Sequence, residues 1–306
     1  MAVYLPPQIR VVVRDWLNSN QVVLLGRDAT ILVDSGYGRD AGETLRRLQS
    51  KTAVGESGVD LLVNTHCHSD HMGGNALLQR KYRCELHIPA GEVPAIESWD
   101  ETALWLAYAD QRCERFAFHG TIVPDADFDW GNLNWRALAA PGHDMHALMF
   151  FCDEEGILIS GDALWENGFG VLLPDADRAI RLAATRGTLD TIAALGVKIV
   201  IPGHGRPFTG VDAALERAYS RLDALAADEL RMVRALLKTM FAFSLLDRGK
   251  MNLQELPAYL QRTPLYAEYG SRRFGWTGPA LARWLVEELV RSRVASSNGE
   301  EIVATR

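Results

Sequence analysis

Three histidines and one aspartate, all side chains that bind divalent metal ions, fall within six consecutive positions of this chain. They are His66, His68, Asp70 and His71. Imidazole nitrogen and carboxylate oxygen are ordinary zinc ligands, and a catalytic zinc takes about three protein ligands and leaves a position for water. The chain has only 8 histidines in 306 residues. The cluster therefore favours a metal site over a surface loop that is rich in histidine by chance.

The spacing inside this cluster follows from the segment before it. Residues 59–64 form a short apolar run that is typical of a buried strand. In an extended segment His66 and His68 point to one side. A turn through Ser69 can bring Asp70 and His71 in from another direction. One metal ion could then use the first pair, and a second ion the last pair.

Three later apolar runs also end next to a residue that a metal site can use. His143 and His204 each follow a Pro-Gly pair, and Asp162 follows the Ser-Gly pair at the end of an apolar run. Loops at the ends of core strands hold such residues on a rigid scaffold and still leave room for a substrate.

The elements that must position these residues are short strands mixed with helices. Apolar residues at helical spacing predict helices at 41–48, 73–78 and 185–195, with an aromatic helical insertion at 91–118. Strands mixed with helices over the first 210 residues predict an α/β layered domain. The predicted strands are 8–13, 21–25, 30–33, 59–64, 84–88, 128–138, 147–151, 156–160 and 197–201.

The C-terminal part of the chain has a different pattern. Residues 212–243 and 280–293 are helical in spacing, and the end of the chain predicts a two-stranded ribbon around 297–299. Helices followed by a small ribbon indicate a winged-helix-like accessory domain. We therefore expect a catalytic domain at 1–210 and a mostly helical, winged-helix-like domain at 211–306.

Composition and charge narrow the class of protein. The chain is 48% hydrophobic and 23% charged, which is usual for a soluble globular protein. The first residues lack the pattern of a secretory signal, and the four cysteines form no CxxC pair, so we expect a cytoplasmic protein. Residues 1–210 carry 18 Lys and Arg against 27 Asp and Glu, and residues 211–306 carry 14 against 12. An acidic catalytic part does not favour a large nucleic-acid footprint.

The candidate ligands stand in the order found in the metallo-β-lactamase superfamily, which the chain resembles over about residues 8–210. The resemblance implies an αββα sandwich with a dinuclear site at one edge, and two Zn²⁺ ions as cofactors, with iron or manganese as alternatives. It implies that the first ion binds His66, His68 and His143. It implies that the second binds Asp70, His71 and His204, with Asp162 bridging both.

Two zinc ions roughly 3.5–4 Å apart share a water molecule and lower its pKa toward ~7, which makes hydroxide available at neutral pH. We expect Asp70 and Asp162 to be the catalytic residues, with Asp70 orienting the nucleophile. Asp34 is expected to accept a hydrogen bond from a ligand imidazole, although a simple turn cap is an equally good interpretation. Tyr37, His146 and Trp165 are candidates for contacts with the ligands or the substrate, against the alternative of ordinary packing.

Departures from the family pattern narrow the choice among the branches of the superfamily. Zinc β-lactamases usually carry Cys or Ser where this chain has Asp162, and acyl-homoserine lactonases carry Tyr where it has Trp165. The flavodiiron branch has Glu in place of His68. Residues 168–171 lack the basic segment of glyoxalase II. The C-terminal extension is similar to a branch that contains endoribonucleases and uncharacterised hydrolases.

The function expected first is a dinuclear metal-dependent hydrolase that acts on a small ester, thioester or lactone. A metal-dependent endoribonuclease with RNA as partner, a mononuclear iron persulfide dioxygenase and a non-catalytic binding module are the alternatives. A small molecule is the expected partner, with no membrane association, and a homodimer is compatible with the sequence.

Overall fold

The structure is a computed structural model that describes residues 3–14 and 17–305. The chain folds into two compact units. We call Met1–Asp100 with Cys113–Ala227 the N-terminal unit, and Glu101–Arg112 with Asp228–Arg306 the C-terminal unit. No helix in the described ranges is long and apolar enough to cross a membrane.

The first sheet of the N-terminal unit has six strands whose spatial order follows the sequence. The first three strands are antiparallel, and the third to the sixth are parallel. The parallel strands β3 and β4 are almost fully apolar and buried, as expected of strands that are covered on both faces. The strands are β1 (Ile9–Val12), β2 (Gln21–Leu25), β3 (Thr30–Val33), β4 (Leu61–Val63), β5 (Glu85–Pro89) and β6 (Gly120–Ile122).

The second sheet of this unit has five strands in the order β11-β10-β9-β8-β7. Only β10 and β11 pair in parallel. The run predicted as one strand at 128–138 is a hairpin, because Gly131 and Asn132 both adopt positive φ angles and turn the chain. The strands are β7 (Asp127–Trp130), β8 (Leu133–Ala139), β9 (Leu148–Cys152), β10 (Ile157–Gly161) and β11 (Ile199–Pro202).

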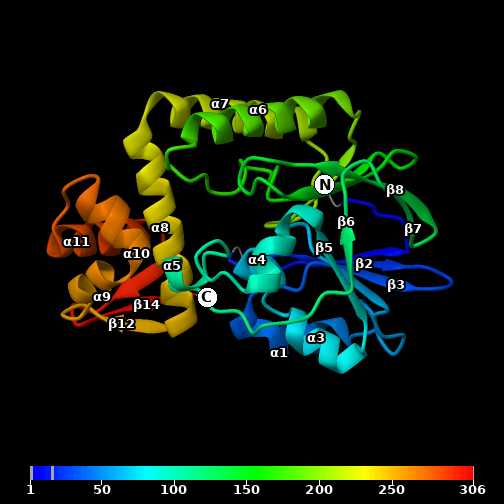
Figure 1. The fold of residues 1–306 in the computed structure, drawn as a ribbon, viewed down its shortest axis with the longest axis horizontal. Helices are drawn as coiled ribbons and strands as arrows, with labels where there is room; N and C mark the ends of the chain where they lie inside the picture. Colours follow the sequence, from blue (N-terminus) through cyan, green and yellow to red (C-terminus); the bar gives the residue numbers. More distant parts are fainter. Residues whose placement is uncertain (1–2, 15–16, 306) are drawn as a thin grey trace. The chain divides into compact units, whose positions relative to one another are not determined.

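The two sheets pack on each other through one apolar core, which includes Leu24 and Val33 of the first sheet and Phe150 and Ile159 of the second. Figure 1 shows α1 and α3 on one side of the sheets, and α6 and α7 on the other. The predicted αββα sandwich of α/β class is therefore confirmed. The helices of this unit are α1 (Ala41–Leu48), α2 (Ser69–Met72), α3 (Asn75–Tyr82), α4 (Val93–Ser98), α6 (Arg178–Ala194) and α7 (Val211–Ala227), with 3₁₀ turns η1 (Gly38–Asp40) and η2 (Ala90–Glu92).

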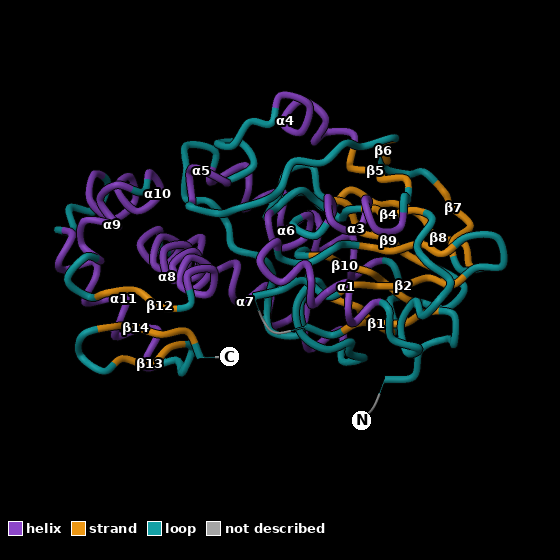
Figure 2. The backbone as a smooth tube through the Cα atoms, turned by 90° about the horizontal axis from the view of Figure 1, so that it is seen from below, coloured by secondary structure: helices purple, strands orange, loops and turns teal. Residues whose placement is uncertain are grey.

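The C-terminal unit is mostly helical and has a three-stranded sheet in the order β12-β14-β13. Figure 2 shows these strands beside one another. The predicted ribbon at the chain end is confirmed as β13 and β14, and β12 adds a strand that the sequence pattern did not predict. The winged-helix relationship itself stays a prediction. The elements are α5 (Leu106–Ala109), α8 (Glu229–Arg248), β12 (Lys250–Asn252), α9 (Leu256–Arg262), α10 (Pro264–Tyr266), the π-helical turn η3 (Ala267–Arg272), α11 (Gly278–Arg291), β13 (Ala295–Ser297) and β14 (Glu301–Ala304).

The two units differ from the predicted domains 1–210 and 211–306 in two places. Helix α7 belongs to the N-terminal unit, because it packs against α6. The long predicted helix at 212–243 is broken at Asp228, whose side chain accepts a hydrogen bond from the backbone N–H of Arg231 and so caps α8. Residues 101–112 of the predicted helical insertion belong to the C-terminal unit.

Candidate metal centre

The histidine cluster is built by a strand that runs directly into a single helical turn. Strand β4 ends at Val63, and α2 begins at Ser69, so His66 and His68 lie on extended chain while Asp70 and His71 lie on the helical turn. This change of backbone conformation is the turn that the spacing predicted. The later candidates follow the ends of β8, β10 and β11, so that all of them lie near one edge of the two sheets.

The first group of candidate ligands is His66, His68 and His143, whose ring nitrogens lie within 4.8 Å of one another. The Nδ1 atom of His68 lies 2.9 Å from Nε2 of His143. The outer nitrogens of two of these rings have other partners. His143 Nδ1 donates to the carbonyl oxygen of Val171 at 2.5 Å, and His66 Nδ1 lies 3.1 Å from Thr65 Oγ1. Both rings therefore turn Nε2 toward the interior of the group.

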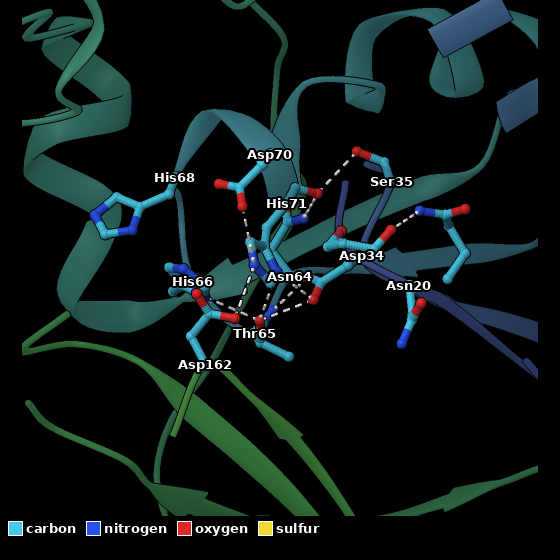
Figure 3. Close-up of polar contacts among 12 residues, drawn as sticks. Asn20, Asp34, Ser35, Asn64, Thr65, His66, His68, Asp70, His71 and Asp162 are labelled. Atoms are coloured by element: carbon cyan, nitrogen blue, oxygen red, sulfur yellow. Dashed lines mark hydrogen bonds and ion pairs between the residues drawn. The ribbon is translucent and has the colours of Figure 1, made fainter. Parts of the chain in front are cut away.

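The second group of candidate ligands is Asp70, His71, Asp162 and His204, whose ligand atoms also lie within 4.8 Å of one another. His204 Nε2 lies 3.0 Å from Asp70 Oδ2, and His71 Nε2 lies 3.3 Å from Asp162 Oδ1. Figure 3 shows the imidazole of His71 between the carboxylates of Asp34 and Asp162.

Asp162 faces both groups. Its Oδ2 atom lies 3.4 Å from His143 Nε2, whereas its Oδ1 atom lies 3.3 Å from His71 Nε2 and 3.6 Å from His204 Nε2. One carboxylate thus offers one oxygen to each group, which is the placement that a bridging ligand requires.

The donor set fits divalent metal ions. Among the described residues, His66 Nε2 is buried and has no hydrogen-bond partner. A buried polar atom without a partner is costly, unless another species such as a metal ion satisfies it. Imidazole and carboxylate donors in two adjacent groups suit zinc, and they also suit iron or manganese. The residues present therefore fit the ions that the sequence implied.

Burial and neighbouring charges give the two groups opposite electrostatic character. Burial, reinforced by the nearby His71, holds the pKa of His66 well below its usual value, and burial together with His143 lowers the pKa of His68 to about 4. These imidazoles are neutral at pH 7, which is the form that binds a metal. Burial opposes the charged form of Asp162, but His204 and His71 outweigh it and hold the pKa of this carboxyl well below its usual value.

Asp34 contacts the second group of candidate ligands through the outer nitrogen of His71. Its Oδ2 atom lies 2.8 Å from His71 Nδ1, while Thr65 donates its backbone N–H and its hydroxyl to the same carboxylate, each at 2.9 Å. Burial opposes the charged form of His71, but Asp34 and Asp162 outweigh it and raise the pKa of this imidazole. A carboxylate on the outer nitrogen fixes the tautomer of a ligand histidine and the orientation of its ring.

The three remaining candidates lie in different surroundings. The indole N–H of Trp165 donates to Asp162 Oδ1 at 3.2 Å, so this side chain does contact the candidate centre. Tyr37 is 0% exposed and is part of the core. His146 is exposed, and its ring lies against the backbone of Gly91.

Several residues around the centre were not singled out by their sequence pattern. Thr65 contacts both Asp34 and His66, and a Cβ atom on Gly203 would lie 2.6 Å from Asp162 Oδ1. Asp144 Oδ2 lies 3.7 Å from His68 Nε2. The position of Asp144 directly after His143 was the one available signal. Nothing in the spacing pointed to Thr65 or Gly203.

Known metallo-hydrolases and a metallo-beta-lactamase family protein are similar to this chain. The chain is 27% identical over 253 residues to the probable metallo-hydrolase YqjP of Bacillus subtilis (strain 168), covering 72% of this chain and 77% of that protein. It is 31% identical over 131 residues to a hydroxyacylglutathione hydrolase of Rhodopseudomonas palustris, covering 43% of this chain and 44% of that enzyme. The crystal structure of a metallo-beta-lactamase family protein from Thermus thermophilus covers 99% of this chain and is itself covered in full, with a TM-score of 0.59 and 20% identity, and so supports the fold alone.

The sequence model of the metallo-beta-lactamase superfamily matches residues 14–204, which is more than half of the chain and includes every candidate ligand. The expected resemblance is confirmed. Together with the fold and the metallo-hydrolase relatives, this match establishes that the chain belongs to the metallo-beta-lactamase superfamily and is a metallo-hydrolase.

Proposed function

We propose that the two groups hold two divalent metal ions, zinc in the first instance, and that the chain hydrolyses a small ester, thioester or lactone. The observation that carries the proposal is Asp162, whose two carboxylate oxygens face the two groups separately. This placement would offer one carboxylate oxygen to each of two adjacent ions.

When bound, two such ions would supply a water molecule with its pKa lowered toward ~7 and would polarise the oxygen of the bond to be broken. Proton transfer and the orientation of the carboxylates are the roles of the chain's own residues. Asp70 lies in the second group with Oδ2 toward His204, and it is placed to accept a proton from the attacking water and return it to the leaving group. Trp165 donates to Asp162 Oδ1 and keeps that carboxylate in its orientation.

The hydroxyacylglutathione hydrolase relatives support thioesters as one substrate class. The segment after Asp162 argues for a substrate other than a glutathione thioester, because residues 168–171 carry no basic side chain for an anionic carrier. The aspartate at position 162, in place of the Cys or Ser usual in zinc β-lactamases, argues against an antibiotic substrate. The C-terminal unit would then serve as an accessory domain of winged-helix type.

The test combines metal counting with a substrate panel of esters, thioesters, lactones, phosphodiesters and RNA. Wild type should bind two ions per chain and hydrolyse a member of the first three classes, and Asp162→Ala should lose at least one ion and most of the activity. Exposed Asp153→Ala is the control and should match wild type. Activity that survives unchanged in Asp162→Ala would refute the bridging role. One iron per chain with oxygen uptake, or cleavage of RNA alone, would replace the proposal with one of the alternatives.

A further inference from the structure

The segment of residues 162–171, which follows β10, contacts both groups of candidate ligands, and we call it the 162–171 loop. The indole N–H of Trp165 donates to Asp162 Oδ1 at 3.2 Å, and the Trp165 ring lies 5.0 Å from the ring of His204. His143 Nδ1 donates to a backbone carbonyl oxygen of the same loop. The conformation of this loop therefore affects how candidate ligands of both groups are oriented.

Phe169 lies between the two parts of the loop that make these contacts. Before it, the carbonyl oxygen of Gly168 accepts the backbone N–H of Trp165 at 2.6 Å. After it, the backbone N–H of Gly170 donates to the carbonyl oxygen of Asp162 at 2.8 Å. The Phe169 side chain itself is only 1% exposed. A group that fixes Phe169 therefore fixes both parts of the loop.

Arg221 of α7 is placed to fix Phe169. Its Nη1 atom donates to the carbonyl oxygen of Phe169 at 2.8 Å. Its guanidinium carbon lies 4.8 Å from the centre of the Phe169 ring, within the range of a cation–π contact. The two segments are in close contact, because a Cβ atom on Gly168 would lie 2.5 Å from Arg221 Nη1. Glycine at this position thus leaves room for the guanidinium group.

The charge of Arg221 has no carboxylate partner. Among the described residues, no ion pair joins Arg221 to an aspartate or glutamate, and burial lowers the pKa of its guanidinium group. Removing a charged group from water costs free energy unless other contacts compensate. Here the carbonyl and the ring of Phe169 are the compensating contacts, so Arg221 is held to the 162–171 loop.

A second arginine of α7 contacts the same loop. Arg217 precedes Arg221 by four residues, so that both side chains lie on one face of the helix. Arg217 Nε donates to the carbonyl oxygen of Glu166 at 2.8 Å, but Arg217 is exposed, whereas Arg221 is partly buried. Helix α7 thus holds the loop at two backbone carbonyls, and Arg221 makes the better shielded contact.

We propose that Arg221 is a positioning residue, which fixes the 162–171 loop through the Phe169 carbonyl and so orients Asp162 and His143 for metal binding. The inference rests on the proposed two-metal centre. In the contacts described above Arg221 meets no candidate ligand, so its effect on the metal ions passes through the backbone of the loop and through Trp165.

The test measures zinc binding in Arg221→Met, by counting Zn²⁺ per chain over a graded series of chelator concentrations, at a temperature where every variant is folded. This substitution removes the donor and the charge but keeps an unbranched side chain. It should weaken zinc binding about 10-fold, the lower end of the usual cost of losing a support behind a ligand. Arg221→Lys should recover part of this loss, because an ammonium group also donates to a carbonyl.

The visible absorption spectrum of the Co²⁺-loaded chain reports the coordination geometry, so it should change in Arg221→Met. Arg186→Met is the matched control. Arg186 of α6 forms an ion pair with Asp223 and lies over the ring of Tyr219, both on α7. The control therefore removes an arginine that packs on α7 away from the 162–171 loop, and it should leave zinc affinity and the Co²⁺ spectrum unchanged.

A double-mutant cycle with Trp165→Phe tests the path. Trp165→Phe removes the N–H group that donates to Asp162 Oδ1. If the loop transmits the effect, Arg221→Met should weaken zinc binding less in the Trp165→Phe background than in wild type. Equal effects in the two backgrounds would overturn the proposal, because Arg221 would then act independently of the loop that carries Trp165.

Wild-type zinc affinity and an unchanged Co²⁺ spectrum in folded Arg221→Met would also overturn the proposal, and would show that Arg221 only stabilises the fold. If Arg221→Met does not fold, Arg221→Gln decides by the same two measurements, since it stays polar but is too short to reach the carbonyl. A wild-type chain that binds fewer than two ions would instead refute the proposed function, whatever the Arg221 variants do, so the two failures are distinguishable.

Discussion

Asp34 combines a left-handed backbone conformation with a side chain that contacts the candidate ligand His71. Its φ of 61° lies in the left-handed region, which Asp and Asn tolerate better than other non-glycine residues. This conformation follows the end of β3 and brings the carboxylate to His71 Nδ1 at 2.8 Å. Aspartate meets both demands, since it tolerates the backbone angle and supplies the charge.

Asp34→Asn should separate the tolerance of the positive φ angle from the effect of the charge. The substitution keeps a side chain that tolerates a positive φ but removes the charge that faces His71, so the fold should persist while metal affinity falls about 10–100-fold. Competition with a chromogenic chelator measures the affinity, and circular dichroism checks the fold. Exposed Asp125, which also has a positive φ of 65°, provides the matched control Asp125→Asn. Equal affinities in wild type and Asp34→Asn would show that Asp34 is only a turn residue.

At the scale of residues, the candidate ligands predicted from the sequence lie together in the structure, whereas most of the residues that contact them were not predicted. His66, Asp70 and His143 stand out because few residue types bind metals and their spacing is local. The hydrogen bonds between Thr65 and Asp34 could not be predicted, because they depend on how two segments that are distant in the sequence lie after the sheet has formed. Tyr37 stands close to Asp34 in the sequence, yet the core encloses it completely.

At the scale of elements, the ends of β10 and β11 bring backbone unusually close to the candidate centre. These neighbouring parallel strands end at Gly161 and Pro202. Gly203 follows, and its N–H donates to the carbonyl of Gly161 at 2.7 Å. A Cβ on Gly203 would meet Asp162 Oδ1 at 2.6 Å and the carbonyl oxygen of Gly161 at 2.9 Å. Glycine is therefore required here for space.

Gly203→Ala should lower stability by about 1–3 kcal/mol, as an overpacked buried site does, and it should also displace Asp162 and reduce the number of bound ions. Urea unfolding of the metal-free chain and metal counting measure the two effects. Gly210→Ala is the matched control, because nothing lies within 4 Å of a Cβ at that position. Loss of stability with full metal content would show that the displaced group is the Gly161 backbone and not Asp162.

The regular elements with clear periodicity were the predictable ones. Residues 21–25, 30–33 and 41–48 were predicted with the same bounds that β2, β3 and α1 have in the structure. Strand β6 was not predicted, since Gly120 and Thr121 give it little apolar signal and its pairing with β5 defines it. Boundaries set by long-range pairing are not encoded in a local pattern.

At the scale of the whole molecule, the C-terminal unit is not a simple appendage after the metal-binding unit. Residues 101–112 leave the N-terminal unit, join the C-terminal unit and return. Leu104 and Leu106 of this segment are buried, and α5 packs against α10. A sequence pattern predicts where composition changes along the chain, but it does not reveal that a short inner segment belongs to a distant unit. The predicted boundary at 210 missed the insertion for this reason.

Asp110 fixes the inserted segment within the C-terminal unit. Its Oδ2 atom accepts from Arg248 Nη2 at 2.6 Å and from the Tyr259 hydroxyl at 2.8 Å, with the backbone at a φ of 54°. Asp110→Asn keeps a residue that tolerates this angle but removes the charge. Because the pair is partly exposed, we expect a loss of about 1 kcal/mol.

That loss should make opening of the segment about fivefold more frequent, and trypsin should cut after the exposed Arg112 faster by the same factor if reclosing outpaces cleavage. Mass spectrometry of the fragments identifies the cut, and its rate is compared with that of Glu101→Gln, an exposed acidic residue of the same segment that should leave the rate unchanged. An unchanged rate in Asp110→Asn would mean that the buried leucines alone hold the segment. Faster cutting with full metal content would show that the segment opens without disturbing the candidate metal centre.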